Sequence, residues 1–143
     1  MRTISQKVSE YALECISDIE SKKFAGKYKS YIKSFPALVI SEGLLMALAF
    51  TLSKSNLKDN GKDGKGDKDA RKMVFVHIAN WLEERNVISV SNPEEEYEKV
   101  IEELSKMDVR KYRLATQEAL KVADWLRRFA EGLIKDEEGG GDT

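Results

Sequence analysis

The sequence predicts an all-α protein, a single compact helical bundle of five to six helices. Apolar side chains recur every three or four residues along most of the chain, and this is the period of an amphipathic helix. The strand-like segment "NVISVS", residues 86–91, has no second strand to pair with, so we expect it to be a connection. A length of 143 residues fits one domain, which we place at residues 1–135.

The first two helices are predicted from apolar spacing. The first is expected to span about five turns and to bury Ile4, Val8, Tyr11, Ala12, Cys15, Ile16 and Ile19. Because Cys15 lies within this stripe, we interpret it as buried packing rather than as a nucleophile. A second, shorter helix is expected from about Phe24 to Ser34, ahead of Pro36.

The most apolar stretch, "FPALVISEGLLMALAF" at residues 35–50, predicts a core helix that begins at Pro36. Glu42 interrupts the run too early for a membrane span, because a central carboxylate opposes insertion into lipid. We expect Glu42 to be a buried or subunit-facing polar group. Gly43, inside this helix, is expected to permit a close helix–helix approach or a kink.

The second half of the chain predicts three more helices. Residues 53–69 are rich in glycine and charge and predict a flexible loop, and the helix after it places His77 on an apolar side, as a core histidine. Asn92 is expected to cap the next helix, with Glu95 completing a capping box. Asp108 is expected to cap the last helix, which runs to about Lys135, before an acidic, glycine-rich tail at residues 136–143.

The composition argues against most enzyme classes. One cysteine and one histidine cannot form a disulfide framework or a Cys/His zinc cluster, and no P-loop, GxSxG, HExxH or GxGxxG motif occurs. We therefore expect no catalytic residue, no metal and no cofactor; a helical enzyme that uses Glu42 and His77 is a distant alternative. The chain shows no secretory leader, and its cysteine usage indicates a reducing compartment, so we expect a cytoplasmic protein.

The basic residues are unevenly distributed. The tail holds four of the 25 acidic residues, so 21 acids face 24 basic residues in the rest of the chain, a net charge of +3. Five lysines fall in a segment without acids and are predicted to share one side of a helix opposite Phe24, Tyr28, Tyr31, Ile32 and Phe35. This lysine cluster comprises Lys22, Lys23, Lys27, Lys29 and Lys33. Such a field attracts a phosphate backbone.

The last helix carries a second candidate, the C-terminal basic patch, which comprises Arg110, Lys121, Arg127 and Arg128. Lys111, Arg113 and Lys135 add positive charge nearby. Asp124 precedes Arg128 by four residues and Glu131 precedes Lys135 by four, so ordinary ion pairs within the helix also account for part of this pattern.

Two blocks of the sequence resemble the small helical subunit of the type III-B CRISPR effector, the Cmr complex. The first is "YKSYIKSFPALVISEGLLMALAF", whose matching positions are Pro36, Ala37, Leu38, Val39, Gly43, Leu44, Ala47, Ala49 and Phe50. The second is "YRLATQEALKVADWLRRFAEGL", with its Trp-Leu-basic-basic-Phe-Ala pattern at residues 125–130. The resemblance runs from about Val8 to Leu133, and the 53–69 loop and the acidic tail depart from it.

The resemblance implies a noncatalytic protein that stacks in several copies along an effector filament. Its expected partners are guide RNA, target RNA, other subunits and further copies of itself, and cleavage belongs to other subunits. It assigns backbone contacts to the lysine cluster and to Arg127 and Arg128, while base pairing reads the sequence. The alternative is a helical protein–protein interaction module whose lysines are only solvated.

Overall fold

The all-α prediction is confirmed by the structure, a computed structural model that describes residues 1–55 and 62–135. Within these ranges the chain forms six helices and no strand: α1 (Ile4–Ile19), α2 (Ala25–Glu42), α3 (Leu44–Ser55), α4 (Lys62–Glu84), α5 (Tyr97–Ser105) and α6 (Val109–Leu133). Part of the predicted loop, residues 56–61, and the predicted tail, residues 136–143, lie outside the described residues.

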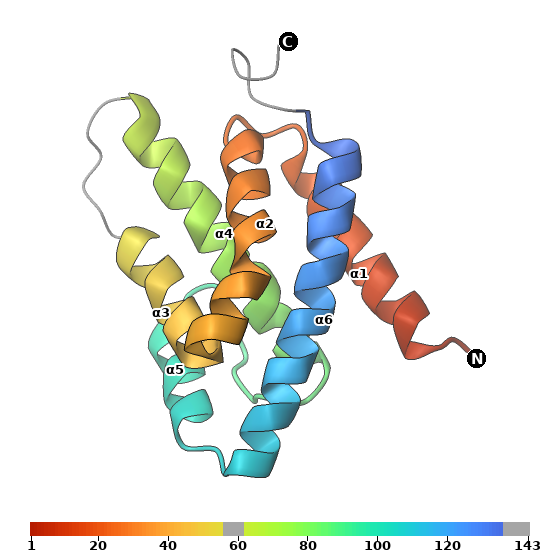
Figure 1. Cartoon of the computed structure of the whole chain (residues 1–143), viewed down its shortest axis with the longest axis vertical. Coiled ribbons are helices and arrows are strands. Elements are labelled where there is room, and N and C mark those ends of the chain that lie inside the picture. The colour runs from red at the N-terminus through yellow and green to blue at the C-terminus, as the bar shows by residue number, and fades with distance from the viewer. Residues whose placement is uncertain (56–61, 136–143) are drawn as a thin grey trace.

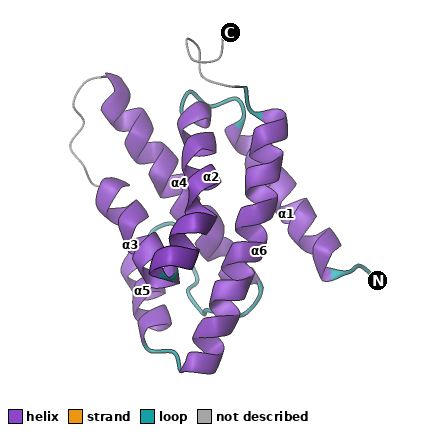
Figure 2. Cartoon of the chain, in the orientation of Figure 1, coloured by secondary structure: helices purple, strands orange, loops and turns teal. Residues whose placement is uncertain are grey.

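The helices pack around α2 and α6, which run side by side in opposite directions (Figure 1). α1 packs on α6, α3 and α4 pack on each other and on α2, and α5 packs on α3 at one end of the bundle. The predicted connection at residues 86–91 contains no strand, and all described segments between helices are loops or turns (Figure 2).

The core is continuous and is centred on α4, whose residues Val74–Ala79 are all buried because α2, α3 and α6 surround the helix. His77 is part of this core. Its Nδ1 lies 2.7 Å from the Tyr28 hydroxyl, and its carbonyl accepts a hydrogen bond from the Tyr11 hydroxyl at 2.6 Å. Burial lowers the pKa of His77 to about 4, so the ring is neutral at neutral pH.

Cys15 packs against the same core, and burial raises the pKa of its thiol to about 12. A thiol with such a pKa stays protonated at neutral pH and is a poor nucleophile. His77 is thus confirmed as a core residue, and Cys15 is confirmed as a packing residue that is partly rather than fully buried.

The predicted helix boundary at Pro36 is wrong, because α2 continues through Pro36 and ends at Glu42, with Gly43 as its C-cap. Tyr28, Ile32, Phe35 and Val39 form one buried stripe that runs past the proline, and its burial outweighs the lost backbone hydrogen bond. Gly43 has φ +94° and ψ 158°, a conformation open almost only to glycine, so it ends α2 and α3 starts at the next residue.

The predicted loop at residues 53–69 is also wrong where the structure describes it. α3 extends to Ser55 and α4 already begins at Lys62. The first turns of α4 rest on α2, since a Cβ at Gly66 would lie 3.9 Å from both Lys27 Cε and Phe24 Cβ. Tertiary packing therefore stabilises helix in a segment whose composition disfavours it.

The capping predictions had mixed outcomes. Asp108 caps α6 as predicted, with its Oδ1 accepting from the backbone N–H of Lys111 at 2.8 Å. The helix predicted from Asn92 starts later, at Tyr97, after a turn at residues 93–95. Glu96, not Glu95, accepts the hydrogen bond from the Asn92 N–H at 3.2 Å. The predicted capping box is therefore wrong both in its partner and in the position of the helix.

Candidate nucleic-acid interface

Most of the lysine cluster lies near the end of the molecule where α1 ends and α2 begins, and Lys33 lies halfway along α2. Lys22 and Lys23 are exposed in the turn between these helices, and Lys33 is exposed on α2. The prediction that all five lysines share one side of a single helix is thus wrong. The predicted apolar side is confirmed, since Tyr28, Ile32 and Phe35 are buried and Phe24 and Tyr31 pack against the core.

Two lysines of the cluster contact neighbouring helices. The aliphatic stem of Lys27 lies over Gly66 of α4, whereas the Lys29 ammonium donates to the Ile134 carbonyl at the end of α6, at 2.9 Å. Positions 27 and 29 are two residues apart and so point about 200° from each other on a helix. Because α2 lies between α4 and α6, these side chains reach opposite neighbours.

The three exposed lysines follow Glu20 and lie in a segment without acids. The segment 21–41 contains no Asp or Glu, and within the described residues no ion pair involves Lys22, Lys23 or Lys33. The contact between Lys29 and Ile134 also brings the exposed Lys135 toward α2. The result is a basic surface in which three exposed lysines form no ion pair with the described residues.

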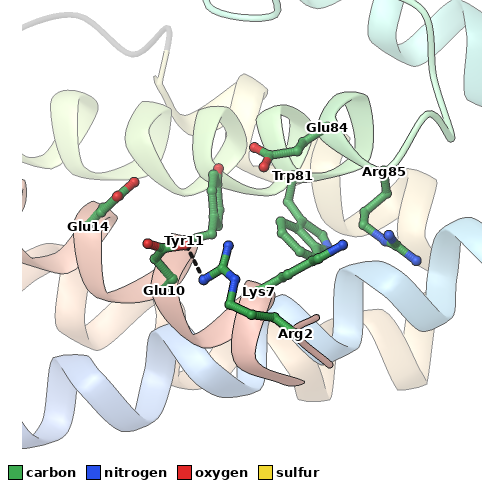
Figure 3. A pocket seen from close by; sticks show the side chains of 8 residues that line it. All are labelled: Arg2, Lys7, Glu10, Tyr11, Glu14, Trp81, Glu84 and Arg85. Carbon is green, nitrogen blue, oxygen red and sulfur yellow. Dashed lines mark hydrogen bonds and ion pairs between the residues drawn. The ribbon is translucent and has the colours of Figure 1, made fainter. Parts of the chain in front are cut away.

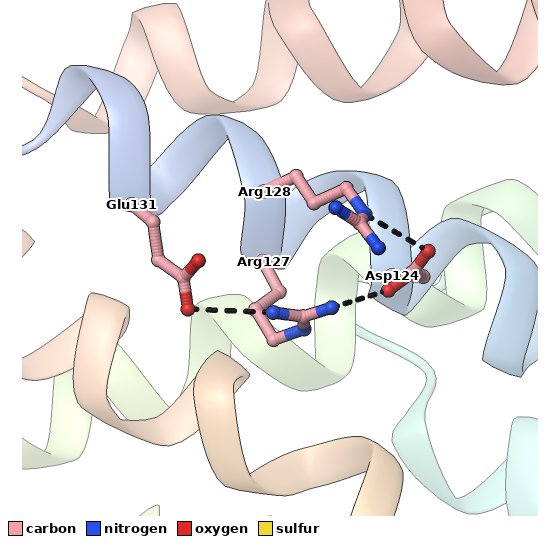
Figure 4. Close-up of polar contacts among 4 residues, drawn as sticks. All are labelled: Asp124, Arg127, Arg128 and Glu131. Carbon is pink, nitrogen blue, oxygen red and sulfur yellow. Dashed lines mark hydrogen bonds and ion pairs between the residues drawn. The ribbon is translucent and has the colours of Figure 1, made fainter.

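The C-terminal basic patch is different, because its arginines are paired within α6 (Figure 4). Arg127 lies 2.6 Å from Asp124 Oδ1 and 3.4 Å from Glu131 Oε2, and Arg128 lies 3.3 Å from Asp124 Oδ2. Burial works to raise the pKa of Asp124, but the hydrogen bonds from both arginines outweigh it and hold that pKa below its usual value. The positive charges of Arg127 and Arg128 are therefore largely cancelled by the negative charges of Asp124 and Glu131.

The remaining members of that patch lie apart. Arg110 is exposed in the first turn of α6, about 25 Å along the helix from Arg127. Lys121 is bound to Glu118 at 3.4 Å, and this carboxylate is only 5% exposed. The members are therefore spread along the continuous helix α6, as their spacing predicts, and Lys121, Arg127 and Arg128 are each paired with an acid on that helix.

Sequence reasoning missed the buried Glu118. Its Oε1 accepts from Trp81 Nε1 at 3.0 Å and lies 3.5 Å from Arg85 Nε, so it joins α4 to α6. The available signal was its position between Ala115 and Ala119, inside the apolar stripe of α6. Glu42, by contrast, is exposed at the end of α2, so of the two expectations for this residue the buried one is wrong, whereas the subunit-facing one stays a prediction.

The alternative of an enzyme using Glu42 and His77 is not supported by this arrangement. His77 is enclosed and hydrogen-bonded to Tyr28, whereas Glu42 is on the surface. Among the residues described, no three His, Cys, Asp or Glu side chains could hold a metal ion together. In the same part of the chain, no helix combines the length and apolar character that a membrane span needs.

The fold and surface define a class, a small all-α protein whose distinctive feature is a basic surface over a well-packed core. The chain matches the model of the family described as "CRISPR-associated protein (Cas_Cmr5)" over residues 4–133. It therefore belongs to the Cmr5 family, and the resemblance to the small subunit of the type III-B Cmr complex is confirmed.

Individual relatives agree with the family match. The chain is 29% identical over 136 residues to "CRISPR system Cmr subunit Cmr5" of Thermus thermophilus, covering 95% of this chain and 100% of that protein. It is 25% identical over 138 residues to the protein of the same name from Thermotoga maritima, covering 96% and 90%. A crystal structure of a Cmr5 family protein from Thermus thermophilus superposes with a TM-score of 0.71, at 26% identity, covering 93% and 99%.

Proposed function

We propose that this chain is a noncatalytic subunit of a cytoplasmic, RNA-guided CRISPR effector of the Cmr type, which targets RNA. In this proposal several copies stack along the complex, and each contacts the backbone of the guide or target RNA through the lysine cluster. Membership of the Cmr5 family supports the assignment, since two curated relatives are named as Cmr subunits. The partners are the other subunits, further copies of the chain and the two RNAs.

The observation that carries the RNA contact is the state of three lysines, Lys22, Lys23 and Lys33. These lysines are exposed, lie in an acid-free segment and form no ion pair within the described residues. Lysine ammonium groups in this state bind phosphates by releasing condensed counterions, without reading bases. A backbone contact of this kind suits a subunit of a machine in which base pairing supplies the sequence specificity.

The RNA contact is tested by fluorescence anisotropy with two labelled RNAs of unrelated sequence over a series of salt concentrations. We expect both RNAs to bind equally, with log K falling linearly with log salt by about 0.7 per single-strand phosphate contacted. Absence of binding at physiological salt would favour the alternative, a protein–protein module without nucleic-acid binding.

The assembly is tested by gentle purification of a tagged copy of the chain from its native host. We expect co-recovery of other subunits and of RNAs that share one constant 5′ segment. Recovery of the chain without RNA and without partners would contradict the proposal.

A further inference from the structure

A charged cleft of about 300 Å³ separates α1 from the end of α4, distinct from the lysine cluster (Figure 3). Its aromatic lining is Tyr11 of α1 and Trp81 of α4, whose ring centroids are 5.2 Å apart at an interplanar angle of 44°. Both rings are anchored from inside, because Tyr11 donates to the His77 carbonyl and Trp81 donates to Glu118. Trp81 is only 1% exposed and Tyr11 is partly buried, so these fixed rings lie behind the cleft and leave mainly the charged side chains accessible.

Charged side chains of both signs surround these rings. Arg2 and Glu10 neutralise each other across 2.6 Å, the one ion pair drawn in Figure 3. Within the described residues, Lys7, Glu14 and Glu84 take part in no ion pair.

Arg85 also lines the cleft, and its charge is only partly compensated. It reaches Glu118 at 3.5 Å, and its enclosed Nε makes no hydrogen bond. Among the described residues, the cleft thus combines two carboxylates and one ammonium group that form no ion pair with one loosely paired guanidinium group.

These charges are separated along the cleft. In Figure 3, Glu14 lies at one end, whereas the Lys7 ammonium extends toward Trp81 and Arg85 at the other. The lining carries three acidic and three basic side chains in total, so it offers no net attraction to a polyanion. The cleft therefore complements a ligand that places a cation near Glu14 and an anion near Lys7 and Arg85.

We infer that this cleft is a docking site for a mixed-charge polypeptide segment of another subunit. A basic side chain of that segment would bind between Glu14 and Glu84, and an acidic one would bind Lys7 and Arg85. Interfaces gain specificity from such matched potentials, and like charges brought together reject wrong partners. This inference rests on the proposed function, because it requires that the chain work inside a multisubunit complex.

The test uses the tagged full chain in its native host, in a strain that lacks the untagged copy. One variant carries Glu14→Lys with Glu84→Lys, and a second carries Lys7→Glu. Arg85 stays unchanged because it also pairs with the buried Glu118. The matched control is Glu102→Lys with Lys106→Glu, which reverses an exposed pair on α5 and keeps the opposite charges together.

We expect each cleft variant to recover other subunits at least about tenfold less than the wild type, because like charges would meet across the interface. The control should recover them normally. Circular dichroism and the thermal midpoint should match the wild type for all variants, since the substituted side chains are on the surface.

Four results would contradict this inference or its premise, and they can be told apart. Normal assembly of both cleft variants would refute the docking site and leave the proposed function intact. Loss of RNA with subunits retained would make the cleft an RNA contact, and altered self-association of the isolated chain would make the occupant a second copy. If the wild type itself recovers no subunit, the proposed function fails first.

Discussion

His77 shows how a residue that suggests chemistry in the sequence serves packing in the fold. Its ring nitrogen and its carbonyl are both hydrogen-bonded to buried tyrosines, Tyr28 and Tyr11. Asp18 acts weakly to raise its pKa, but burial dominates and lowers it to about 4. The folded state therefore holds this imidazole neutral across the range in which an unfolded chain would protonate it.

This depressed pKa predicts a loss of stability in mild acid. Below pH 6.5, the usual pKa of histidine, the unfolded chain binds a proton at His77, whereas the folded chain binds it only near pH 4 and below. Each pH unit in that window should cost the wild type about 1.4 kcal/mol of unfolding free energy. Urea unfolding between about pH 7.5 and about pH 5.5 measures this, and His77→Gln should show a shallower decline. Equal declines in both proteins would show that His77 does not titrate as proposed.

At the scale of the helix, Gly43 and Gly132 have the same neighbours in sequence, a glutamate before and a leucine after, but different structural roles. Gly43 ends α2 with φ +94°, and a Cβ there would find Tyr112 Oη at 3.8 Å, an ordinary contact. The same tyrosine hydroxyl accepts from the Leu45 N–H at 2.9 Å, which fixes the start of α3. Gly132 lies within α6, and a Cβ there would meet nothing within 4 Å. Both positions have room for a Cβ, so it is the backbone conformation that makes glycine necessary at position 43 and not at position 132.

Replacing each glycine by alanine tests this difference. Gly43→Ala should reduce the unfolding free energy by about 1–3 kcal/mol, because alanine is strained at that φ and ψ. Gly132→Ala should leave stability unchanged or raise it by about 0.5 kcal/mol, because alanine is the better helix former. Chemical denaturation of both variants provides the measurement. A neutral Gly43→Ala would mean that the α2–α3 junction adopts another conformation.

At the scale of the whole molecule, the two basic regions differ in how their charge is balanced. The exposed lysines around the start of α2 have no ion partners among the described residues, whereas Arg127 and Arg128 are bound to acids on the same helix. Ion pairs of this exposed kind contribute little to stability. Their main consequence is that a phosphate must compete with Asp124 and Glu131 for the arginines.

We therefore expect the lysine cluster to dominate RNA binding. Neutralising Lys22, Lys23 and Lys33 to glutamine should weaken binding and reduce the salt slope by about 2, the value for three single-strand phosphate contacts. Neutralising Arg127 and Arg128 should have a smaller effect, and neutralising Lys99 and Lys106 on the glutamate-rich α5 is the control. Anisotropy titrations over salt compare the three. A larger effect of the arginines would place the RNA along α6, and no effect of either set would refute both assignments.

Sequence reasoning located the residues of the candidate site but not their arrangement. The acid-free run of lysines is visible in the printed sequence. A projection onto one helix could not show that Lys22 and Lys23 precede α2. It also could not show that Lys27 contacts α4 whereas Lys29 contacts the end of α6. The ion pairs of Arg127 and Arg128 were partly visible as helical spacings, although Arg127 rather than Lys135 is the residue paired with Glu131.

The sequence by itself determined the all-α class, the buried stripe of α1 at Val8, Ala12, Ile16 and Ile19, the cap at Asp108 and the family, because these depend on period, local hydrogen bonding and residue identity. Only the tertiary structure decided that α2 continues through Pro36, that α4 begins at Lys62 and that Glu118 is buried. In each of these cases a local preference is opposed by contacts with a distant helix. Burial and pairing between helices outweigh local propensities of about 1–3 kcal/mol, and no local pattern records which distant residues will meet.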